Sequence, residues 1–334
     1  MARAVTDIGT PRDDIGLFFE AIDLDAMRRG YIGMLVAPII ESVYKRGRFS
    51  RRDVKQVLKS TDASRTASGG YNRVTSRFDE GDFSVKERGL EERVDMNEHA
   101  ENLGMIDSEL VAAEATRHGV LEDHELRVIQ KINSVAVAET LSAGDKWSND
   151  AADVVKYFAR LKRVFRLQCG VQPNCMVIDE SALDVLAVNP SVIEAAGRVG
   201  SSVEQALEFN DVNRELRRRA VAIALGLQEI IVSKGIHNTA GEPLESSLST
   251  IFPEDKAVLM VKSAEPTTRH QQWLRTVHWS AGGSRPGCAF EEYVEPQTKS
   301  NVIRHLLDTD VIEVNREAVM VLGGVLDLDF FAAA

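Results

Sequence analysis

The spacing of apolar residues predicts one long helix in the first half of the chain. From about Ser108 to Val137, apolar side chains recur at three- and four-residue intervals, with Glu, Arg and Lys between them. A helix of about 30 residues, with a rise of 1.5 Å per residue, would be on the order of 45 Å long, which exceeds most helices of globular proteins. We therefore expect a helix that runs along the molecule as a spine.

The region that follows predicts an α/β layer from Asn149 to about Met260. A helix is expected from Ala151 to Leu167, with Ser148 or Asn149 as its cap and Gly170 as its stop. The expected elements after it are a buried strand at 175–178, a helix at 180–186, a short helix after Asn189-Pro190, a basic helix at "NRELRRRAVAIALGL" and a strand at "QEIIVSKG". Alternation of helices with strands is typical of such a layer.

Beyond Ile251 the pattern changes to apolar stretches separated by polar loops, which indicates antiparallel β-structure. These stretches are "KAVLMVK", "QQWLRTVHWS", "CAFEEYVEP" and a run from "NVIRHLL" to "AVMVLGGVL". We expect the late strands and the spine helix to share one domain, interrupted by the α/β layer. The fold class is therefore α+β with an inserted α/β unit.

Residues 71–95 alternate apolar and polar positions, which predicts a β-hairpin with its turn at Asp79–Asp82. Twelve of the 25 residues are charged. An isolated hairpin is marginally stable in water, and one this polar adds little to a core. We expect it to dock on a surface outside its own core.

Composition limits the function classes. The chain has 334 residues, 44% of them hydrophobic, and a net charge of −11, which argues against nucleic-acid binding through global charge. The longest apolar run, Tyr31–Ile40, is shorter than the roughly 20 residues that cross a bilayer, so no membrane association is expected. Three cysteines without metal-ligand spacing indicate free thiols in a reducing compartment, with pairing of Cys169 and Cys175 as the alternative.

Residues 45–59 form the sharpest charge cluster, with seven basic residues and one acidic residue. Such a run could face nucleic acid, an acidic partner or only water. Its candidate contact residues are Lys45, Arg46, Arg48, Arg51, Arg52 and Lys55.

The sequence assembles no catalytic constellation, and we expect no enzyme activity, cofactor or metal. "CMVIDES" resembles a Walker B strand, but the chain has no Gly-Lys dipeptide and therefore no P-loop. His118 and His124 are six residues apart on the predicted helix and lie on different faces, unlike the ligands of a zinc helix. Cys175 lies in a predicted buried strand, where a thiol behaves as a small hydrophobe.

The order of these segments resembles that of major capsid proteins of tailed bacteriophages, from about Tyr31 to Leu326. "GMLVAPIIESVYKRGRF" is similar to the family's N-terminal arm, and "YNRVTSRFDEGDFSVKERGLEERVD" to the end of that arm and its extended E-loop. "DSELVAAEATRHGVLEDHELRVIQKI" is similar to the spine helix, and "GVQPNCMVIDESALDVLAVNPSVIEAA" to the first helix-strand-helix unit of the A-domain.

The resemblance implies a division into an N-terminal arm (1–66), an E-loop hairpin (67–96), a P-domain (97–148 and 261–334) and an A-domain (149–260). In such shells the E-loop lies over a neighbouring subunit, which would explain the polarity of the hairpin. Its expected contact residues are Phe78, Phe83, Lys86, Arg88 and Arg93.

The resemblance further implies self-assembly into hexamers and pentamers of an icosahedral virion shell, built in the host cytoplasm. The expected partners are other copies of the chain, a portal, separate scaffolding or decoration proteins, and double-stranded DNA contacted weakly and without sequence specificity. The alternatives are a compartment of the encapsulin type that encloses enzymes and an α/β enzyme that uses the layer at 149–260.

Overall fold

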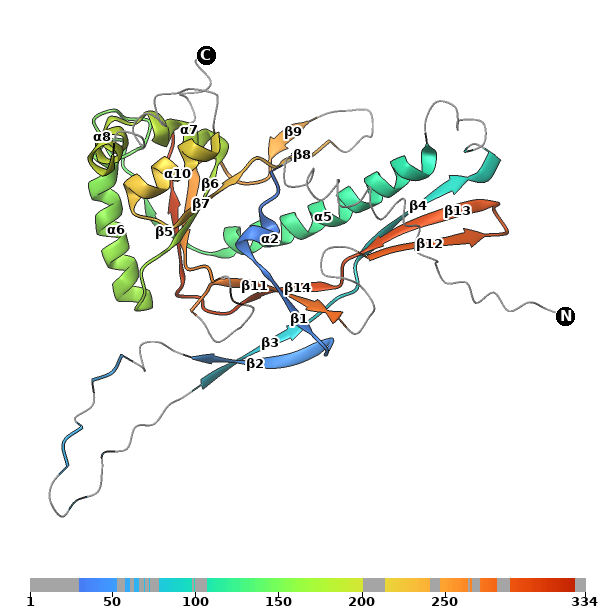
Figure 1. Cartoon of the computed structure of the whole chain (residues 1–334), viewed down its shortest axis with the longest axis horizontal. Coiled ribbons are helices and arrows are strands. Elements are labelled where there is room, and N and C mark those ends of the chain that lie inside the picture. The colour runs from blue at the N-terminus through green and yellow to red at the C-terminus, as the bar shows by residue number, and fades with distance from the viewer. Residues whose placement is uncertain are drawn as a thin grey trace.

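The computed structural model describes residues 30–52, 58–60, 63–65, 69, 72, 78–97, 99, 107–200, 214–240, 247–263, 265, 271–280 and 289–327. Figure 1 shows one long helix, α5, with a group of helices and strands at one of its ends and the strands β4, β12 and β13 at the other. Among the described helices, none is long and apolar enough to cross a bilayer.

The predicted spine helix is confirmed as α5 (Ser108–Ser134). The Asp107 side chain caps it by accepting hydrogen bonds from the amides of Glu109 and Leu110. The helix ends three residues before the predicted boundary because the backbone turns extended at Val135, and the chain continues into β5 (Val137–Thr140).

A five-stranded sheet forms the centre of the main core, with strand order β5-β15-β10-β6-β7. Its middle strand, β10 (Lys256–Met260), is antiparallel to β15 (Val319–Gly323) and to β6 (Cys175–Asp179), while β7 (Glu229–Ser233) is parallel to β6. Every residue of β6 and of β15 is buried. The strand β15 pairs with β10, another of the late strands, and with β5, which follows the spine helix. Because β10 also pairs with β6, the late strands and the α/β layer share this sheet.

The described helices that pack around this sheet (Figure 1) were all predicted: α6 (Val154–Cys169), α7 (Glu180–Val188), α8 (Pro190–Val199) and α10 (Arg214–Leu225). The residue predicted to cap α6 was wrong. Asp153, rather than Ser148 or Asn149, accepts the hydrogen bond from the Lys156 amide. Gly170 stops the helix as predicted, with a left-handed φ of 80° that favours glycine.

Two three-stranded sheets accompany α5. One has the order β1-β11-β14, formed by β1 (Ile39–Ser42), β11 (Leu274–Trp279) and β14 (Thr309–Glu313). The other has the order β12-β13-β4, formed by β12 (Ala289–Glu295), β13 (Ser300–Leu306) and β4 (Gly89–Asp95), and packs on α5 through Val94, Ala112, Ala113 and Ile303. A short helix, α2 (Gly33–Val36), precedes β1. The strands β8 (Ile236–Asn238) and β9 (Leu248–Thr250) form a separate antiparallel pair.

The hairpin predicted across 71–95 is wrong. Its intended turn, Asp79–Asp82, lies inside one continuous strand, β3 (Phe78–Ser84), which pairs with β2 (Arg46–Arg52). The second strand of the predicted hairpin corresponds to β4, which pairs with β13 rather than with β3. Strand pairing depends on contacts far apart in sequence, and alternation within one segment does not reveal the partner.

The two cysteines that the structure describes, Cys169 and Cys175, are buried and are not joined to each other by a disulfide. Their pairing, considered from the sequence, is therefore absent. Burial raises the pKa of the Cys175 thiol to about 12, which agrees with its expected behaviour as a small hydrophobe.

Candidate assembly ribbon

Strands β2 and β3 form a two-stranded antiparallel ribbon at the margin of the molecule (Figure 1). Seven residue pairs align, from Arg46 opposite Ser84 to Arg52 opposite Phe78. We call this pair of strands the β2–β3 ribbon. It contains the candidate contact residues Arg46, Arg48, Arg51, Arg52, Phe78 and Phe83.

Each strand of the ribbon carries the same Gly-x-Phe spacing, and the register places each glycine opposite the phenylalanine of the other strand. Gly47 is paired with Phe83, and Gly81 with Phe49. A Cβ added to Gly47 would lie 2.7 Å from the Phe83 ring, and one added to Gly81 would lie 2.5 Å from the Phe49 ring. The rings therefore occupy the space that glycine leaves open, a packing known to support glycines in sheets.

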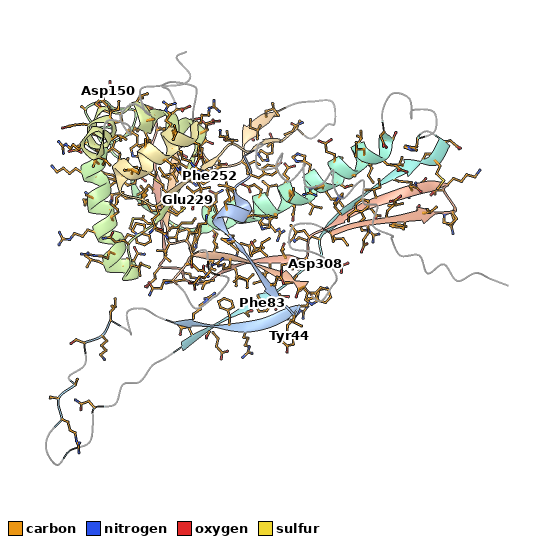
Figure 2. The ribbon with its side chains drawn as sticks, viewed as in Figure 1. Tyr44, Phe83, Asp150, Glu229, Phe252 and Asp308 are labelled. Atoms are coloured by element: carbon orange, nitrogen blue, oxygen red, sulfur yellow. The ribbon has the colours of Figure 1, made fainter. Side chains whose placement is uncertain are left out.

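The base of the ribbon packs on the β1-β11-β14 sheet. Phe49 and Phe83 lie against a small core formed by Val85, Val277, Ile312 and Val314, and Figure 2 shows Phe83 in this position. The Ser84 amide donates to Asp310 Oδ2 at 2.9 Å, and Arg51 donates to the Glu313 carbonyl at 2.7 Å. These contacts fix the direction in which the ribbon leaves the body of the protein.

The Trp279 indole adds a second anchor at the turn before β2. Its Nε1 donates to the Val43 carbonyl at 3.1 Å, and the Lys45 ammonium lies 5.0 Å from the centre of its ring. Lys45 also forms an ion pair with Glu87 at 3.7 Å. Lys45 therefore contacts its own chain, whereas Tyr44, next to it, is 74% exposed.

The basic residues of β2 divide between the two faces of the ribbon. Arg46 and Arg48 are exposed, and Arg48 pairs with Glu80 of β3 at 3.1 Å. Arg51 points to the opposite face, where its guanidinium lies 5.2 Å from the Phe49 ring. Arg52 and Phe78 form the last backbone pair, and Lys55 lies outside the described residues.

The remaining predicted contact residues lie outside the ribbon. Lys86 forms an isolated β-bridge with Thr309. Arg88 pairs with Asp123 of α5 at 3.3 Å, and Arg93 pairs with Glu295 of β12 at 3.3 Å. The expectation that these three residues lie in an extended loop is therefore wrong. Their role in contacts between copies of the chain stays a prediction.

The β12-β13-β4 sheet carries an acidic patch that the sequence analysis missed. Glu91, Glu291 and Tyr293 surround the Arg304 guanidinium, with the shortest distance, 2.6 Å, to Glu91. The hydrogen bond from Arg304 lowers the pKa of Glu91. Cross-strand register, which sequence alternation does not give, brings these groups together.

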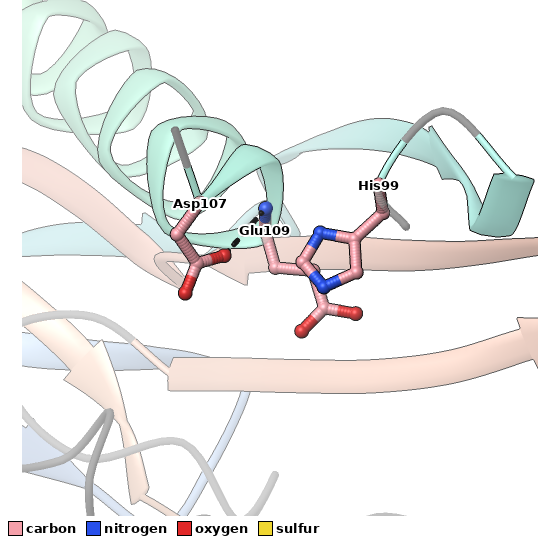
Figure 3. A group of neighbouring side chains, drawn as sticks. All are labelled: His99, Asp107 and Glu109. Atoms are coloured by element: carbon pink, nitrogen blue, oxygen red, sulfur yellow. Dashed lines mark hydrogen bonds between the residues drawn. The ribbon is translucent and has the colours of Figure 1, made fainter. Parts of the chain in front are cut away.

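His99, Asp107 and Glu109 also approach one another, with one potential ligand atom of each within 4.8 Å of the others (Figure 3). Two structural contacts already use the carboxylates. Asp107 caps α5, and Glu109 accepts a hydrogen bond from Asn301 at 2.7 Å. These contacts account for the positions of both carboxylates without a metal ion.

Comparisons with known proteins place the fold. No family model and no curated protein sequence matches this chain. A phage-related protein from Bordetella bronchiseptica aligns with a TM-score of 0.60 over 89% of this chain and 92% of its own, at 14% identity. The capsid structure of cyanophage P-SCSP1u aligns with a TM-score of 0.56 over 87% of both chains, at 10% identity. The capsid of phage XM1 aligns with a TM-score of 0.52 over 88% of this chain and 92% of its own, also at 10% identity. The chain therefore has the fold of bacteriophage capsid proteins.

Proposed function

We propose that this chain is a major capsid protein whose copies assemble as hexamers and pentamers into an icosahedral shell around double-stranded DNA. The observation that carries the proposal is the β2–β3 ribbon on a capsid-type fold. Its apolar contacts gather on one face, around Phe49 and Phe83, while Arg46 and Arg48 are exposed on the other.

A two-stranded ribbon is marginally stable without further packing. Within the described chain, Phe49 and Phe83 pack on the small core at the base of the ribbon. A neighbouring copy that covers the exposed face would bury more of it. The proposed contact would thus stabilise the ribbon and the shell together.

Charge complementarity supports contact between copies. The basic residues Arg46 and Arg48 lie on β2, and the acidic residues Glu91 and Glu291 lie on the separate β12-β13-β4 sheet. Opposite charges across an interface favour one orientation of approach more than they add affinity. In the proposed shell, the ribbon of one copy lies against the acidic patch of the next.

Electron microscopy of the purified protein and of cells that express it tests assembly. Closed or partly closed shells are expected, and discrete small particles under every salt condition would contradict the proposal. Nuclease-protected DNA in the shells distinguishes a phage head from a compartment that encloses enzymes. Shells that hold only protein cargo would favour the compartment.

The double variant Arg46→Glu and Arg48→Glu tests the ribbon itself. Shell yield should fall at least tenfold while the secondary structure of the subunit is unchanged. The variants Arg163→Glu and Arg166→Glu on α6 together change the net charge equally at exposed positions and serve as the charge-matched control. Equal loss in both double variants would assign the effect to net charge rather than to the ribbon.

We expect the assembled protein to reside in the virion after assembly in the host cytoplasm. A portal and separate scaffolding or decoration proteins are its further proposed partners. The acidic chain, with a net charge of −11, suits weak and non-specific contact with packaged DNA.

A further inference from the structure

Basic side chains surround a hollow near the C-terminal end of α5. The hollow has a volume of about 310 Å³ and lies where α5, β14 and the chain between β3 and β4 meet. Figure 1 shows this connecting chain where it passes β14 on its way to β4. We call this space the α5–β14 hollow. The basic residues that line it are Lys86, Arg88, Arg127 and Lys131.

The chain between β3 and β4 supplies two of these residues. Lys86 forms an isolated antiparallel bridge with Thr309, and the Arg88 carbonyl accepts a hydrogen bond from the Leu307 amide at 2.8 Å. Side chains two residues apart on an extended chain point to the same side. Glu87, between them, does not line the hollow, so its negative charge does not offset theirs there.

The helix α5 supplies the other two. Arg127 and Lys131 are four residues apart and therefore share one face of the helix. The Arg127 guanidinium is held by the Asp123 carboxylate at 2.9 Å and by the Thr309 hydroxyl at 3.1 Å. Lys131 lies in the last turn, where a positive charge also suits the helix dipole. Among the described residues, neither Lys131 nor Lys86 forms an ion pair.

Arg88 has donor capacity that its own chain leaves unused. Its Nη1 lies 3.3 Å from Asp123, which is longer than the about 2.7–2.9 Å typical of a charge-assisted hydrogen bond. The same carboxylate is closer to Arg127. Arg88 Nε is buried and has no hydrogen-bond partner in the described part of the chain. An anion in the hollow would give this guanidinium a further acceptor.

The acidic groups at the hollow do not balance the basic ones. Among the residues that line it, Asp310 is acidic, and its Oδ2 already accepts a hydrogen bond from the Ser84 amide. With Asp123 included, four positive charges face two negative charges, which leaves an excess of two. Burial lowers the pKa of Arg127, and the charge of Arg88 lowers it further, against the opposing charge of Asp123. The hollow is therefore a positive site on a chain whose net charge is −11.

A second hollow, between residues 30–35 and α10, shows that basic residues alone do not make such a site. Each of its basic residues forms an ion pair with an acidic residue of α7 or α10, which leaves little attraction for an anion. These paired residues are Arg214, Arg217, Arg218 and Lys234.

We propose that the α5–β14 hollow binds a phosphate group that carries two negative charges, either inorganic phosphate or the end of a phosphomonoester. Such a group neutralises the excess of two positive charges, whereas a carboxylate or a phosphodiester of a nucleic-acid backbone carries one charge. Guanidinium and ammonium groups both donate well to phosphate oxygens.

The size of the hollow agrees with this ligand. Its volume equals that of about ten water molecules at about 30 Å³ each, which holds a phosphate group and part of its hydration shell. The proposal goes beyond the proposed function and does not depend on it, because every group of the site belongs to one copy of the chain.

Equilibrium dialysis of the full-length protein against radiolabelled inorganic phosphate tests the site, at constant ionic strength and at about pH 8, where phosphate is a dianion. Saturable binding is expected. The double variant Lys86→Gln and Lys131→Gln should weaken it at least about tenfold, because two of the positive charges are lost.

The double variant Lys156→Gln and Lys299→Gln changes the net charge equally at exposed positions and is the matched control. Its affinity for phosphate should stay within about twofold of the wild type, because distant exposed charges are screened. Since dialysis measures binding to subunits and to shells alike, its outcome is independent of assembly.

The variant Asp310→Asn tests the site in the opposite direction. It removes the negative charge that lines the hollow and keeps an oxygen that accepts from the Ser84 amide. Phosphate binding should tighten about threefold. A gain in affinity cannot result from a variant that fails to fold.

Dimethyl phosphate, which carries a single negative charge and resembles the nucleic-acid backbone, is the competitor that tests the charge of the ligand. It should displace phosphate at least about tenfold less well than unlabelled phosphate does. The proposal is overturned if phosphate shows no saturable binding, if both double lysine variants lose affinity equally, or if dimethyl phosphate competes as well as phosphate.

Discussion

Gly81 lies directly opposite Phe49 in the β2–β3 ribbon, at a distance that leaves no space for a side chain at position 81. In the reciprocal pair, Gly47 lies opposite Phe83, two residues away from the first pair on each strand. Two glycines are unfavourable for an isolated strand. Their presence here shows that ring packing across the ribbon outweighs strand propensity.

The substitution Gly81→Val should therefore weaken the ribbon although valine favours strands. We expect a local cost of about 1–3 kcal/mol, because the added atoms displace the Phe49 ring. Hydrogen exchange of residues 46–52 measures it. Ser50→Val, at an exposed position of the same ribbon, is the control and should leave protection unchanged or improved. Greater protection in Gly81→Val would refute the packing argument.

Removal of the cap of α6 should destabilise the α/β layer modestly. Asp153→Ala leaves the Lys156 amide without its side-chain acceptor and should lower the free energy of unfolding by about 1 kcal/mol. Ser148→Ala removes the cap expected from the sequence and should have no effect. Chemical denaturation compares the two variants, and a larger loss in Ser148→Ala would favour the sequence-based assignment.

The core face of α6 should tolerate truncation far less than its outer face. Phe165 is fully buried, and Phe165→Ala should lower the free energy of unfolding by about 3–5 kcal/mol through the cavity it leaves. Leu167, two residues away, is 72% exposed, so Leu167→Ala should change stability by less than about 0.5 kcal/mol. Denaturant unfolding of both variants tests the difference. Similar losses would mean that α6 packs by another face.

Acid should destabilise the protein through His305. This residue is 1% exposed, its Nδ1 lies 2.8 Å from Thr116 Oγ1, and burial together with the charge of Arg117 lowers its pKa to about 4. The unfolded chain binds the proton more tightly, so stability present above pH 6.5 is lost as pH falls toward 4, by on the order of 3 kcal/mol.

The comparison of wild type with His305→Gln isolates this effect from other titrating groups. The difference in unfolding free energy between the two proteins should shrink as pH falls from 7 to 4. A difference that stays constant with pH would show that His305 ionises alike in the folded and unfolded chains.

The sequence by itself determined the elements whose signals are local. The periodicity of apolar residues predicted α5, the buried strand β6 and the helices around it, and Gly170 marked the end of α6. Helical contacts join residues three or four apart, so a short stretch carries the whole signal. The order of these elements was enough for a resemblance to phage capsid proteins, whose fold the chain has.

Only the tertiary structure decided which strands pair and which polar groups are buried. Alternation within 71–95 fits a hairpin as well as two strands with separate partners. The matching Gly-x-Phe spacings of β2 and β3 indicate ring packing on glycine only when the register of the two strands is known. The buried Glu125 carboxylate likewise accepts a hydrogen bond from the Gly33 amide, 92 residues away along the chain. Strand register and burial arise from packing between distant segments, and a pattern read along one segment contains neither.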